Sequence, residues 1–181
     1  MMSYLLAFLT LTFREFVSTN SGDVKWDHCV VVLMSLRRPI LIMGLPGAGK
    51  TTLSKALAPH LRAVHFNNDD VRQNISRDLG FSHADRIEQA RRMRWLCNCV
   101  LEAGHAAIAD FICPLAATRE AFGACFLIWV DRIQHSRFAD TDRIFEPPTK
   151  WGVRVTPQGD VEHWVRQTLD AYVAEQTAQS C

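Results

Sequence analysis

Residues 40–52 read Ile-Leu-Ile-Met-Gly-Leu-Pro-Gly-Ala-Gly-Lys-Thr-Thr. The first four residues form a continuous apolar run, which is typical of a strand buried on both faces of a sheet. The glycines that follow allow the backbone to curl so that several N–H groups point inward, and the next helix directs its positive end at the same place. The stretch therefore predicts a strand, a phosphate-binding loop (P-loop) and a helix in immediate succession.

The residue types in this loop indicate which phosphate it binds. Lys50 can reach the β- and γ-phosphates of a nucleoside triphosphate, and the hydroxyl of Thr51 can hold Mg²⁺. A plain glycine-rich turn would need neither side chain, nor the strand before it and the helix after it. We therefore predict a site for ATP and Mg²⁺. Its nucleotide-binding residues are predicted to be Gly44, Gly47, Gly49, Lys50, Thr51 and Thr52.

The rest of the chain continues to alternate between strand-like and helix-like segments. Strands are expected at residues 40–43, 63–66, 106–109, 126–130 and 152–155. Helices are expected at residues 50–61, 70–76, 84–103 and 114–122, with a last helix that Asp160 caps. This order favours an α/β fold with a central parallel five-stranded sheet and helices on both faces.

Other segments carry simpler expectations. Residues 132–150 are polar, include Pro147 and Pro148, and are predicted to form a mobile loop. Trp95 is expected in the core. The apolar stripe of the last helix is expected to face inward; it consists of Val161, Trp164, Val165, Leu169 and Tyr172.

Composition sets limits on the class of protein. The chain has 181 residues, of which 48% are hydrophobic and 22% charged, as expected for one globular domain. The net charge of +1 argues against a nucleic-acid or membrane partner. The six cysteines are scattered without a Cys-x-x-Cys pair, so we expect reduced thiols and a cytoplasmic location rather than a metal site or disulfides.

The first 33 residues stand apart from this pattern. Residues 4–13 are mostly apolar but too short to span a bilayer, and they lack the features of a signal peptide. Met34 shortly precedes the first core strand. We interpret residues 1–33 as an N-terminal extension that need not belong to the native protein, or as a loosely packed appendage, and residues 34–181 as the domain that contains the P-loop.

A second stretch follows the second expected strand. Residues 67–92 read Asn-Asn-Asp-Asp-Val-Arg-Gln-Asn-Ile-Ser-Arg-Asp-Leu-Gly-Phe-Ser-His-Ala-Asp-Arg-Ile-Glu-Gln-Ala-Arg-Arg. This resembles the adenylylsulfate kinase (APS kinase) family, whose segment runs Asp-Gly-Asp-Asn-Val-Arg, Asp-Leu-Gly-Phe-Ser and Asp-Arg-x-Glu-Asn-x-Arg-Arg at the same spacing. Residues 111–114, Phe138 and residues 145–148 resemble later segments of that family. The resemblance covers about residues 39–155 and implies the P-loop kinase fold.

The resemblance implies roles for several residues. Asp69 follows a strand at the edge of the sheet where ligands bind, and a carboxylate there can orient a hydroxyl or accept its proton. The family places an acid in this role, so Asp69 and Lys50 are the expected catalytic residues, with Asp70 as the alternative to Asp69. Arginines would pair with acceptor oxygens and two rings would enclose adenine. The implied acceptor-binding residues are Arg72, Phe81, Arg86, Gln89, Ile112 and Phe138.

The sequence departs from the family in three places. The lid is strongly shortened, and Arg132, Arg137 or Arg143 could supply charge to the transferring phosphoryl group. Asp110 stands where the family has a small residue; it could hold Mg²⁺ together with Thr51, or cap the helix that follows Pro114. Gln89 replaces an asparagine and Cys113 a serine near the acceptor pocket.

Taken together, these features imply an ATP-dependent kinase that acts on a hydroxyl of a small nucleotide, by resemblance the 3′-hydroxyl of adenylyl sulfate. The departures leave open a different nucleotide-linked acceptor, such as a cytidine diphosphate derivative, or a polynucleotide end. A non-catalytic nucleotide-binding module is the alternative from another class. A GTPase switch is disfavoured because neither Asp-x-x-Gly nor Asn-Lys-x-Asp occurs. A homodimer is possible, and no membrane partner is expected.

Overall fold

A five-stranded sheet forms the middle layer of the computed structural model, which describes residues 38–178. The strand order is β2-β3-β1-β4-β5, and every pairing is parallel. The strands are β1 (Ile40–Met43), β2 (Val64–Asn67), β3 (Ala107–Asp110), β4 (Phe126–Val130) and β5 (Val153–Val155). The predicted fold class is confirmed, whereas the predicted extension over residues 1–33 lies outside the described residues.

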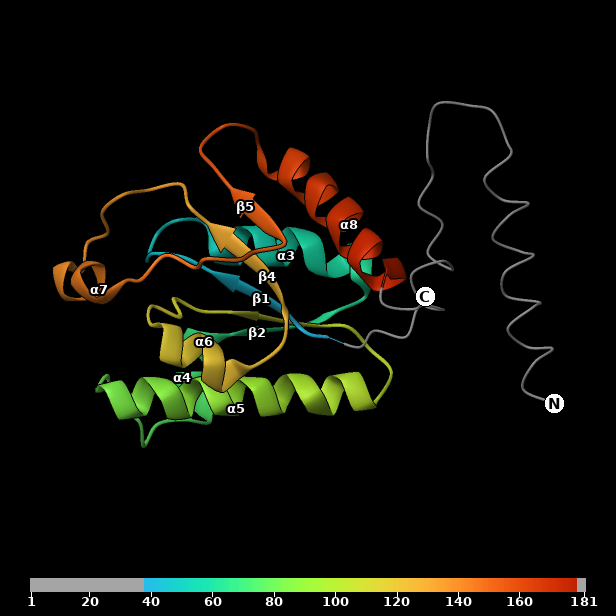
Figure 1. Ribbon diagram of the computed structural model, residues 1–181. Coiled ribbons are helices and arrows are strands. Elements are labelled where there is room, and N and C mark those ends of the chain that lie inside the picture. The colour runs from blue at the N-terminus through green and yellow to red at the C-terminus, as the bar shows by residue number, and fades with distance from the viewer. Residues whose placement is uncertain (1–37, 179–181) are drawn as a thin grey trace, which may run out of the picture.

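Helices cover both faces of this sheet (Figure 1). Two of them, α3 (Lys50–Leu61) and α8 (Val161–Ala178), lie on one face. The other face carries α4 (Asn68–Asn74), α5 (His83–Glu102) and α6 (Ala116–Phe122). The short helix α7 (Ala139–Ile144) lies beyond the carboxyl ends of the strands. Among residues 38–178, no helix has both the length and the apolarity that crossing a membrane requires.

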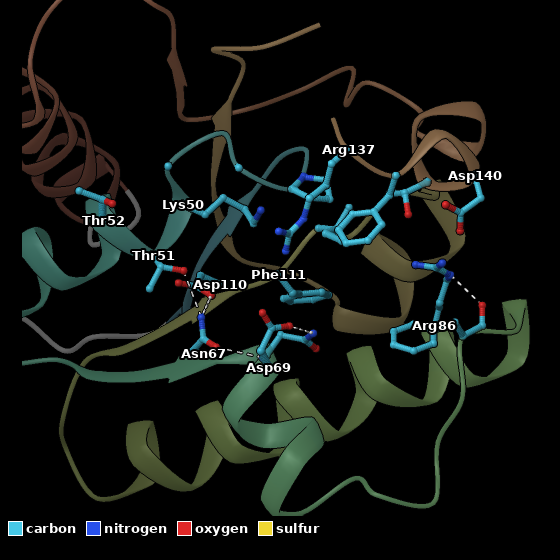
Figure 2. A pocket seen from close by; sticks show the side chains of 18 residues that line it. Lys50, Thr51, Thr52, Asn67, Asp69, Arg86, Asp110, Phe111, Arg137 and Asp140 are labelled. Carbon is cyan, nitrogen blue, oxygen red and sulfur yellow. Dashed lines mark hydrogen bonds between the residues drawn. The ribbon is translucent and has the colours of Figure 1, made fainter. Parts of the chain in front are cut away.

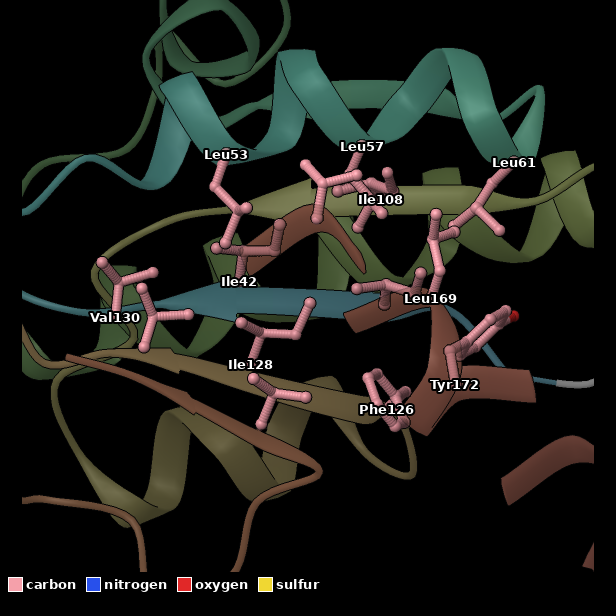
Figure 3. Close-up of a cluster of buried hydrophobic side chains, with 14 of the residues drawn as sticks. Ile42, Leu53, Leu57, Leu61, Ile108, Phe126, Ile128, Val130, Leu169 and Tyr172 are labelled. Carbon is pink, nitrogen blue, oxygen red and sulfur yellow. The ribbon is translucent and has the colours of Figure 1, made fainter. Parts of the chain in front are cut away.

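Alternation along the strands divides the apolar core into two layers. In β1, Ile40 and Ile42 pack toward α3 and α8, whereas Leu41 and Met43 pack toward α5. Successive side chains of a strand point to opposite faces, so a run of four apolar residues feeds both layers. Figure 3 shows the first layer, where Leu53, Leu57 and Leu61 of α3 meet the strands. The sheet is thereby packed between two layers of helices, which hold the carboxyl ends of its strands in place.

Most element boundaries agree with the sequence prediction within two residues. β1, α3 and β4 begin and end as predicted. Asp160 caps α8 as predicted, because its Oδ1 accepts the backbone N–H of His163 at 2.8 Å.

The prediction of a mobile loop over residues 132–150 is wrong in part, because this segment contains α7. The helix is only six residues long, too short for a periodic pattern to reveal it. A local contact holds its start: Asp142 accepts the Ser136 hydroxyl at 2.6 Å and the Ser136 backbone N–H at 2.8 Å.

Two apolar side chains also differ from expectation. Trp95 is 66% exposed, because the buried face of α5 runs through Met93 and Cys97, and Trp95 lies two residues from each of them. Val161 is exposed because it begins α8, although Val165 four residues later is buried. The other predicted inward residues of α8, Trp164 included, pack against the core as expected.

Candidate active site

The phosphate loop connects β1 to α3 at the centre of the sheet. Its conformation favours glycine at three places, because φ is 148° at Gly44, 85° at Gly47 and 102° at Gly49. A β-carbon at Gly44 would also overlap with the carbonyl oxygen of Val130 on β4. Gly44 therefore lies against β4 on the sheet side of the loop. Gly47, Gly49 and Thr52 line the cavity on its other side.

Lys50 and Thr51 open α3 and line the cavity above the loop. The Lys50 ammonium donates to the carbonyl oxygen of Leu45 at 3.0 Å, across the loop. Burial lowers the pKa of this ammonium, while the carboxylates of Asp110 and Asp69 act in the opposite direction. The lysine is therefore a partly desolvated cation held over the loop, where a phosphate would find it.

Asp110 ends β3 and is 1% exposed. Its Oδ2 lies 2.9 Å from His65 Nε2, and its Oδ1 accepts from Asn67 Nδ2 at 2.8 Å. The same Asn67 Nδ2 also donates to the hydroxyl of Thr51 at 3.1 Å. Asp110 and Thr51, the two predicted metal ligands, are thus joined through one amide.

The alternative role for Asp110, capping the helix after Pro114, is wrong. That helix, α6, begins at Ala116, whose backbone N–H donates to Glu146 Oε2 at 2.7 Å. Asp110 instead bonds within the sheet edge, to side chains of β2.

The oxygen donors of this region suit Mg²⁺. No group of three or more His, Cys, Asp or Glu side chains gathers as a metal cage within residues 38–178. Mg²⁺ is usually held by one or two carboxylates together with waters and substrate phosphates. A hydroxyl at Thr51 and a carboxylate at Asp110 beside a phosphate loop match that pattern.

A cavity of about 690 Å³ joins the phosphate loop to the acceptor segments (Figure 2). Lys50, Asp69 and Arg86 all line it, although they come from α3, α4 and α5. Its lining comprises Pro46, Gly47, Gly49, Lys50, Thr51, Thr52, Asn67, Asn68, Asp69, Phe81, Arg86, Asp110, Phe111, Ile112, Arg137, Phe138, Asp140 and Thr141. Most of the predicted site residues thus surround one space.

A recess of about 70 Å³ adjoins the acceptor half of this cavity, and Phe81, Arg86 and Ile112 line both. The remaining predicted acceptor residues, Arg72 and Gln89, line the recess. All six predicted acceptor residues therefore lie around two adjoining spaces.

Phe81 is held by arginines although its ring is 71% exposed. The Arg72 guanidinium lies 4.7 Å from the ring centroid and that of Arg86 5.8 Å. Arg72 Nη1 also donates to the carbonyl of Gly80 at 2.8 Å, which fixes the loop before the ring. Burial and the nearby Arg86 lower the pKa of Arg72. The exposed face of the Phe81 ring can therefore stack on a ligand.

Gln89 is 2% exposed at the floor of the recess. Its Nε2 donates to Asn68 Oδ1 at 3.0 Å, while its Oε1 has no hydrogen-bond partner within residues 38–178. A buried carbonyl without a donor is costly, so a ligand or a water is needed to complete it.

The three candidate arginines of the shortened lid separate in space. Arg137 lines the cavity, with its guanidinium 4.8 Å from the centroid of the Phe138 ring. Arg132 lies against the phosphate loop, because its Nη1 is 3.4 Å from where a β-carbon on Gly49 would be. Arg143 is exposed and its Nε donates to the Ala139 carbonyl within α7. Arg132 and Arg137 are therefore the better placed of the three.

Several residues that line the cavity were not assigned to it from the sequence. Asn67 ends β2 and Asn68 begins α4, directly before Asp69, and that position was their available signal. Phe111 was noted only as part of a resembling segment. Asp140 enters the cavity on α7, a helix that no sequence pattern indicated.

Comparison with known proteins agrees with this geometry. A sequence model of the family described as "Adenylylsulphate kinase" matches residues 38–127. The chain belongs to this family. An adenylyl-sulfate kinase of Synechococcus sp. (strain JA-3-3Ab) is 42% identical over 82 residues, which are 42% of this chain and 47% of that protein. The bifunctional enzyme NodQ of Rhizobium sp. (strain BR816) is 37% identical over 117 residues, 58% of this chain and 18% of that enzyme. The chain thus spans less than half the length of the curated relatives it matches.

The fold of the family is also found among solved structures. The Mycobacterium tuberculosis APS kinase CysC, solved in complex with AMPPNP and APS, superposes with a TM-score of 0.64 at 22% identity. The match covers 74% of this chain and 96% of that chain. The P-loop kinase fold predicted from residues 40–52 and the alternating elements is thereby confirmed.

Proposed function

We propose that the protein is an ATP- and Mg²⁺-dependent kinase that transfers the γ-phosphoryl group to a hydroxyl of a small nucleotide. The observation that carries this proposal is the single cavity, which has a phosphate loop at one end and Asp69, Phe81 and Arg86 at the other. Donor and acceptor would meet inside it with a carboxylate between them. Family membership supports the same chemistry.

The side chains would act mainly through position and charge, because phosphoryl transfer asks little covalent chemistry of the protein. The loop N–H groups and Lys50 hold the triphosphate, and Arg132 and Arg137 add positive charge where negative charge spreads in the transition state. Asp69 orients the attacking hydroxyl or takes its proton. Thr51 and Asp110 would hold Mg²⁺, which would supply positive charge to the phosphates of ATP.

The acceptor that we propose is adenylyl sulfate, phosphorylated at its 3′-hydroxyl. The rings of Phe81 and Phe138 both line the cavity, and Arg86 lies at the same end to meet anionic oxygens. The Mycobacterium tuberculosis APS kinase CysC was solved in complex with APS. These observations support adenylyl sulfate ahead of other nucleotides.

A second acceptor, another nucleotide-linked metabolite such as a cytidine diphosphate derivative, is favoured by one contact. Asn68 and Gln89 hydrogen-bond to each other beside the acceptor space, and both differ from the glycine and asparagine of the family pattern. Both side chains are longer than those of the family pattern and both end in an amide. They change the shape and the hydrogen-bonding groups of the pocket, and with them the acceptor that fits.

A coupled ADP-release assay with a panel of acceptors tests these proposals. The panel contains adenylyl sulfate, adenosine monophosphate, a cytidine diphosphate derivative and an oligonucleotide with a 5′-hydroxyl. Preferred turnover of adenylyl sulfate is expected. Turnover of only another nucleotide would replace the acceptor, and binding of ATP without turnover of any acceptor would mean a nucleotide-binding module.

We propose that the enzyme works in the cytoplasm, where ATP is supplied, and that it forms a homodimer. Light scattering coupled to size-exclusion chromatography measures the mass directly. A mass of one chain at micromolar concentration would contradict the dimer.

A further inference from the structure

Asn67 lies where three elements of the site meet. It is the last residue of β2 and the N-cap of α4. Its Nδ2 donates to Thr51 Oγ1 at 3.1 Å and to Asp110 Oδ1 at 2.8 Å. Its Oδ1 accepts the backbone N–H groups of Asp69 at 3.0 Å and Asp70 at 3.2 Å. A primary amide has two N–H donors and one oxygen with two lone pairs, so every bond that it can make is used.

Strand register places Asn67 beside Asp110. The two residues are direct partners across the parallel β2–β3 pair. Asp110 points to the same side as Ile108, which packs in the core layer below α3. Both side chains therefore project from neighbouring strands toward the first turn of α3, where Thr51 begins the helix with Lys50. Both residues line the cavity that contains the phosphate loop, so a carboxylate at the end of either strand can face that cavity.

This proximity limits which side chains fit the pair. Asp110 is almost fully buried; Asn67 donates to its Oδ1, and His65 Nε2 lies 2.9 Å from its Oδ2. A carboxylate at position 67 could not donate, and it would place a second negative charge at hydrogen-bonding distance in a site of low dielectric. Since a donor is required opposite an acid, the two positions hold one carboxylate and one amide.

We propose that Asn67 is a positioning residue that holds Asp110 and Thr51 as one pair of oxygen ligands and fixes the start of α4, which carries Asp69, and that positions 67 and 110 share a single carboxylate that works from either strand. The proposal rests on the kinase function given above. Asn67 would take part in metal binding indirectly, by holding the side chains of Thr51 and Asp110 in place.

Four full-length variants test it: Asn67→Asp, Asp110→Asn, the exchange variant that carries both changes, and Asn67→Ser. Gln73→Glu is the matched control, since it makes the same amide-to-acid change at an exposed position of α4. The first readout is the affinity for Mn²⁺ in the presence of ADP, measured by electron paramagnetic resonance. Thermal midpoints without ligand and kcat and KM for ATP are measured alongside.

Both single variants, Asn67→Asp and Asp110→Asn, should lose about tenfold or more in Mn²⁺ affinity, as is typical when a group that orients a metal ligand is changed. The exchange variant should recover to within about threefold of the parent protein, since one carboxylate and one amide are again paired. Gln73→Glu should match the parent. If Asn67→Asp binds Mn²⁺ as the parent does, or if the exchange variant is no better than Asp110→Asn, the shared carboxylate is refuted.

Asn67→Ser guards against a variant that fails to fold. Serine caps a helix as well as asparagine does, so α4 and the thermal midpoint should be retained. The serine side chain has a single O–H donor and cannot donate to both Thr51 and Asp110, so Mn²⁺ affinity should fall about tenfold, with kcat reduced more than KM. Parental Mn²⁺ affinity in this variant would refute the positioning role. Because Mn²⁺ and ADP are measured without an acceptor, this result is independent of whether the proposed acceptor is correct.

Discussion

The ammonium group of Lys50 lies above the phosphate loop and is partly desolvated. Burial weakens its charged form, two carboxylates support it, and its ammonium bonds to a loop carbonyl that a phosphate oxygen would replace. A partly desolvated ammonium interacts more strongly with an incoming anion than one in bulk water does. The residue is therefore placed to stabilise charge on the transferring group.

Lys50→Ala should abolish measurable turnover, a loss of about a thousandfold or more, because it removes a buried positive charge from the transition state. Steady-state kinetics with saturating ATP measure the loss. Lys55→Ala, an exposed lysine of the same helix, should retain parental activity. Full activity of Lys50→Ala would contradict the site assignment.

Phe138 should act on acceptor binding rather than on chemistry. Its ring lines the cavity and is 44% exposed, so one face is free to stack on a base. Phe138→Ala should raise the acceptor KM about tenfold with little change in kcat, because base stacking contributes about 1–3 kcal/mol. Trp95→Ala, an exposed ring outside the cavity, serves as the control. An unchanged KM for Phe138→Ala, with a reduced kcat, would assign the ring to another step.

At the scale of elements, α7 brings the lid residues to the site. The contact between Ser136 and Asp142 ties the approach segment to the first turns of this helix, and Arg137 and Phe138 lie between the two. Hydrogen bonds from the Ser136 hydroxyl and N–H lower the pKa of Asp142, so it accepts as a carboxylate at neutral pH. α7 contributes no residue to either apolar layer. Its order thus depends on a few polar contacts.

Asp142→Ala should therefore raise the acceptor KM about tenfold while the thermal midpoint changes little, since the misplaced groups are in the site and not in the core. Hydrogen exchange of residues 136–144 should become faster. Asp170→Ala, an exposed aspartate of α8, is the comparison variant. Unchanged exchange in this segment would show that another contact orders the lid.

At the scale of the whole molecule, the parallel sheet gathers the site at one edge. The phosphate loop follows β1, Asp110 ends β3, Asn67 ends β2, and Arg132 comes shortly after β4. Loops at the carboxyl ends of strands next to a change of strand order form a crevice in such folds. Residues that are distant in the chain thereby become neighbours without any bend in the strands.

The apolar layers on the two faces of the sheet should also keep several cysteine thiols from reacting with reagents in solution. Burial raises the pKa of Cys97, Cys113 and Cys125 to about 12, so these thiols stay protonated at pH 8 and react slowly. Cys99 is exposed on α5. Brief treatment with iodoacetamide at pH 8, followed by peptide mass spectrometry, should label Cys99 well ahead of the other three. Equal labelling of Cys113 in the folded protein would contradict the packing of the acceptor loop.

Local patterns were enough to single out most of the residues that line the cavity. The glycine spacing of the phosphate loop, Lys50 and Thr51 are adjacent in the chain, and the acceptor segment around Asp69 and Arg72 is continuous, so their arrangement follows from short-range geometry. The error on Trp95 arose because composition alone does not tell which face of a helix meets the sheet. The missed helix α7 is too short for periodicity and is held by tertiary and polar contacts.

The sequence by itself determined a phosphate loop between a buried strand and a helix, an alternating α/β order and the likeness of residues 67–92 to one kinase family. Only the tertiary structure decided which side chains Asp110 contacts, which arginines lie near the loop, and that Asn67 joins Thr51 to Asp110. The physical reason is register. Which side chains meet across two strands depends on how the chain between residues 67 and 110 folds back, and hydrogen bonds between them exist only once that alignment is made.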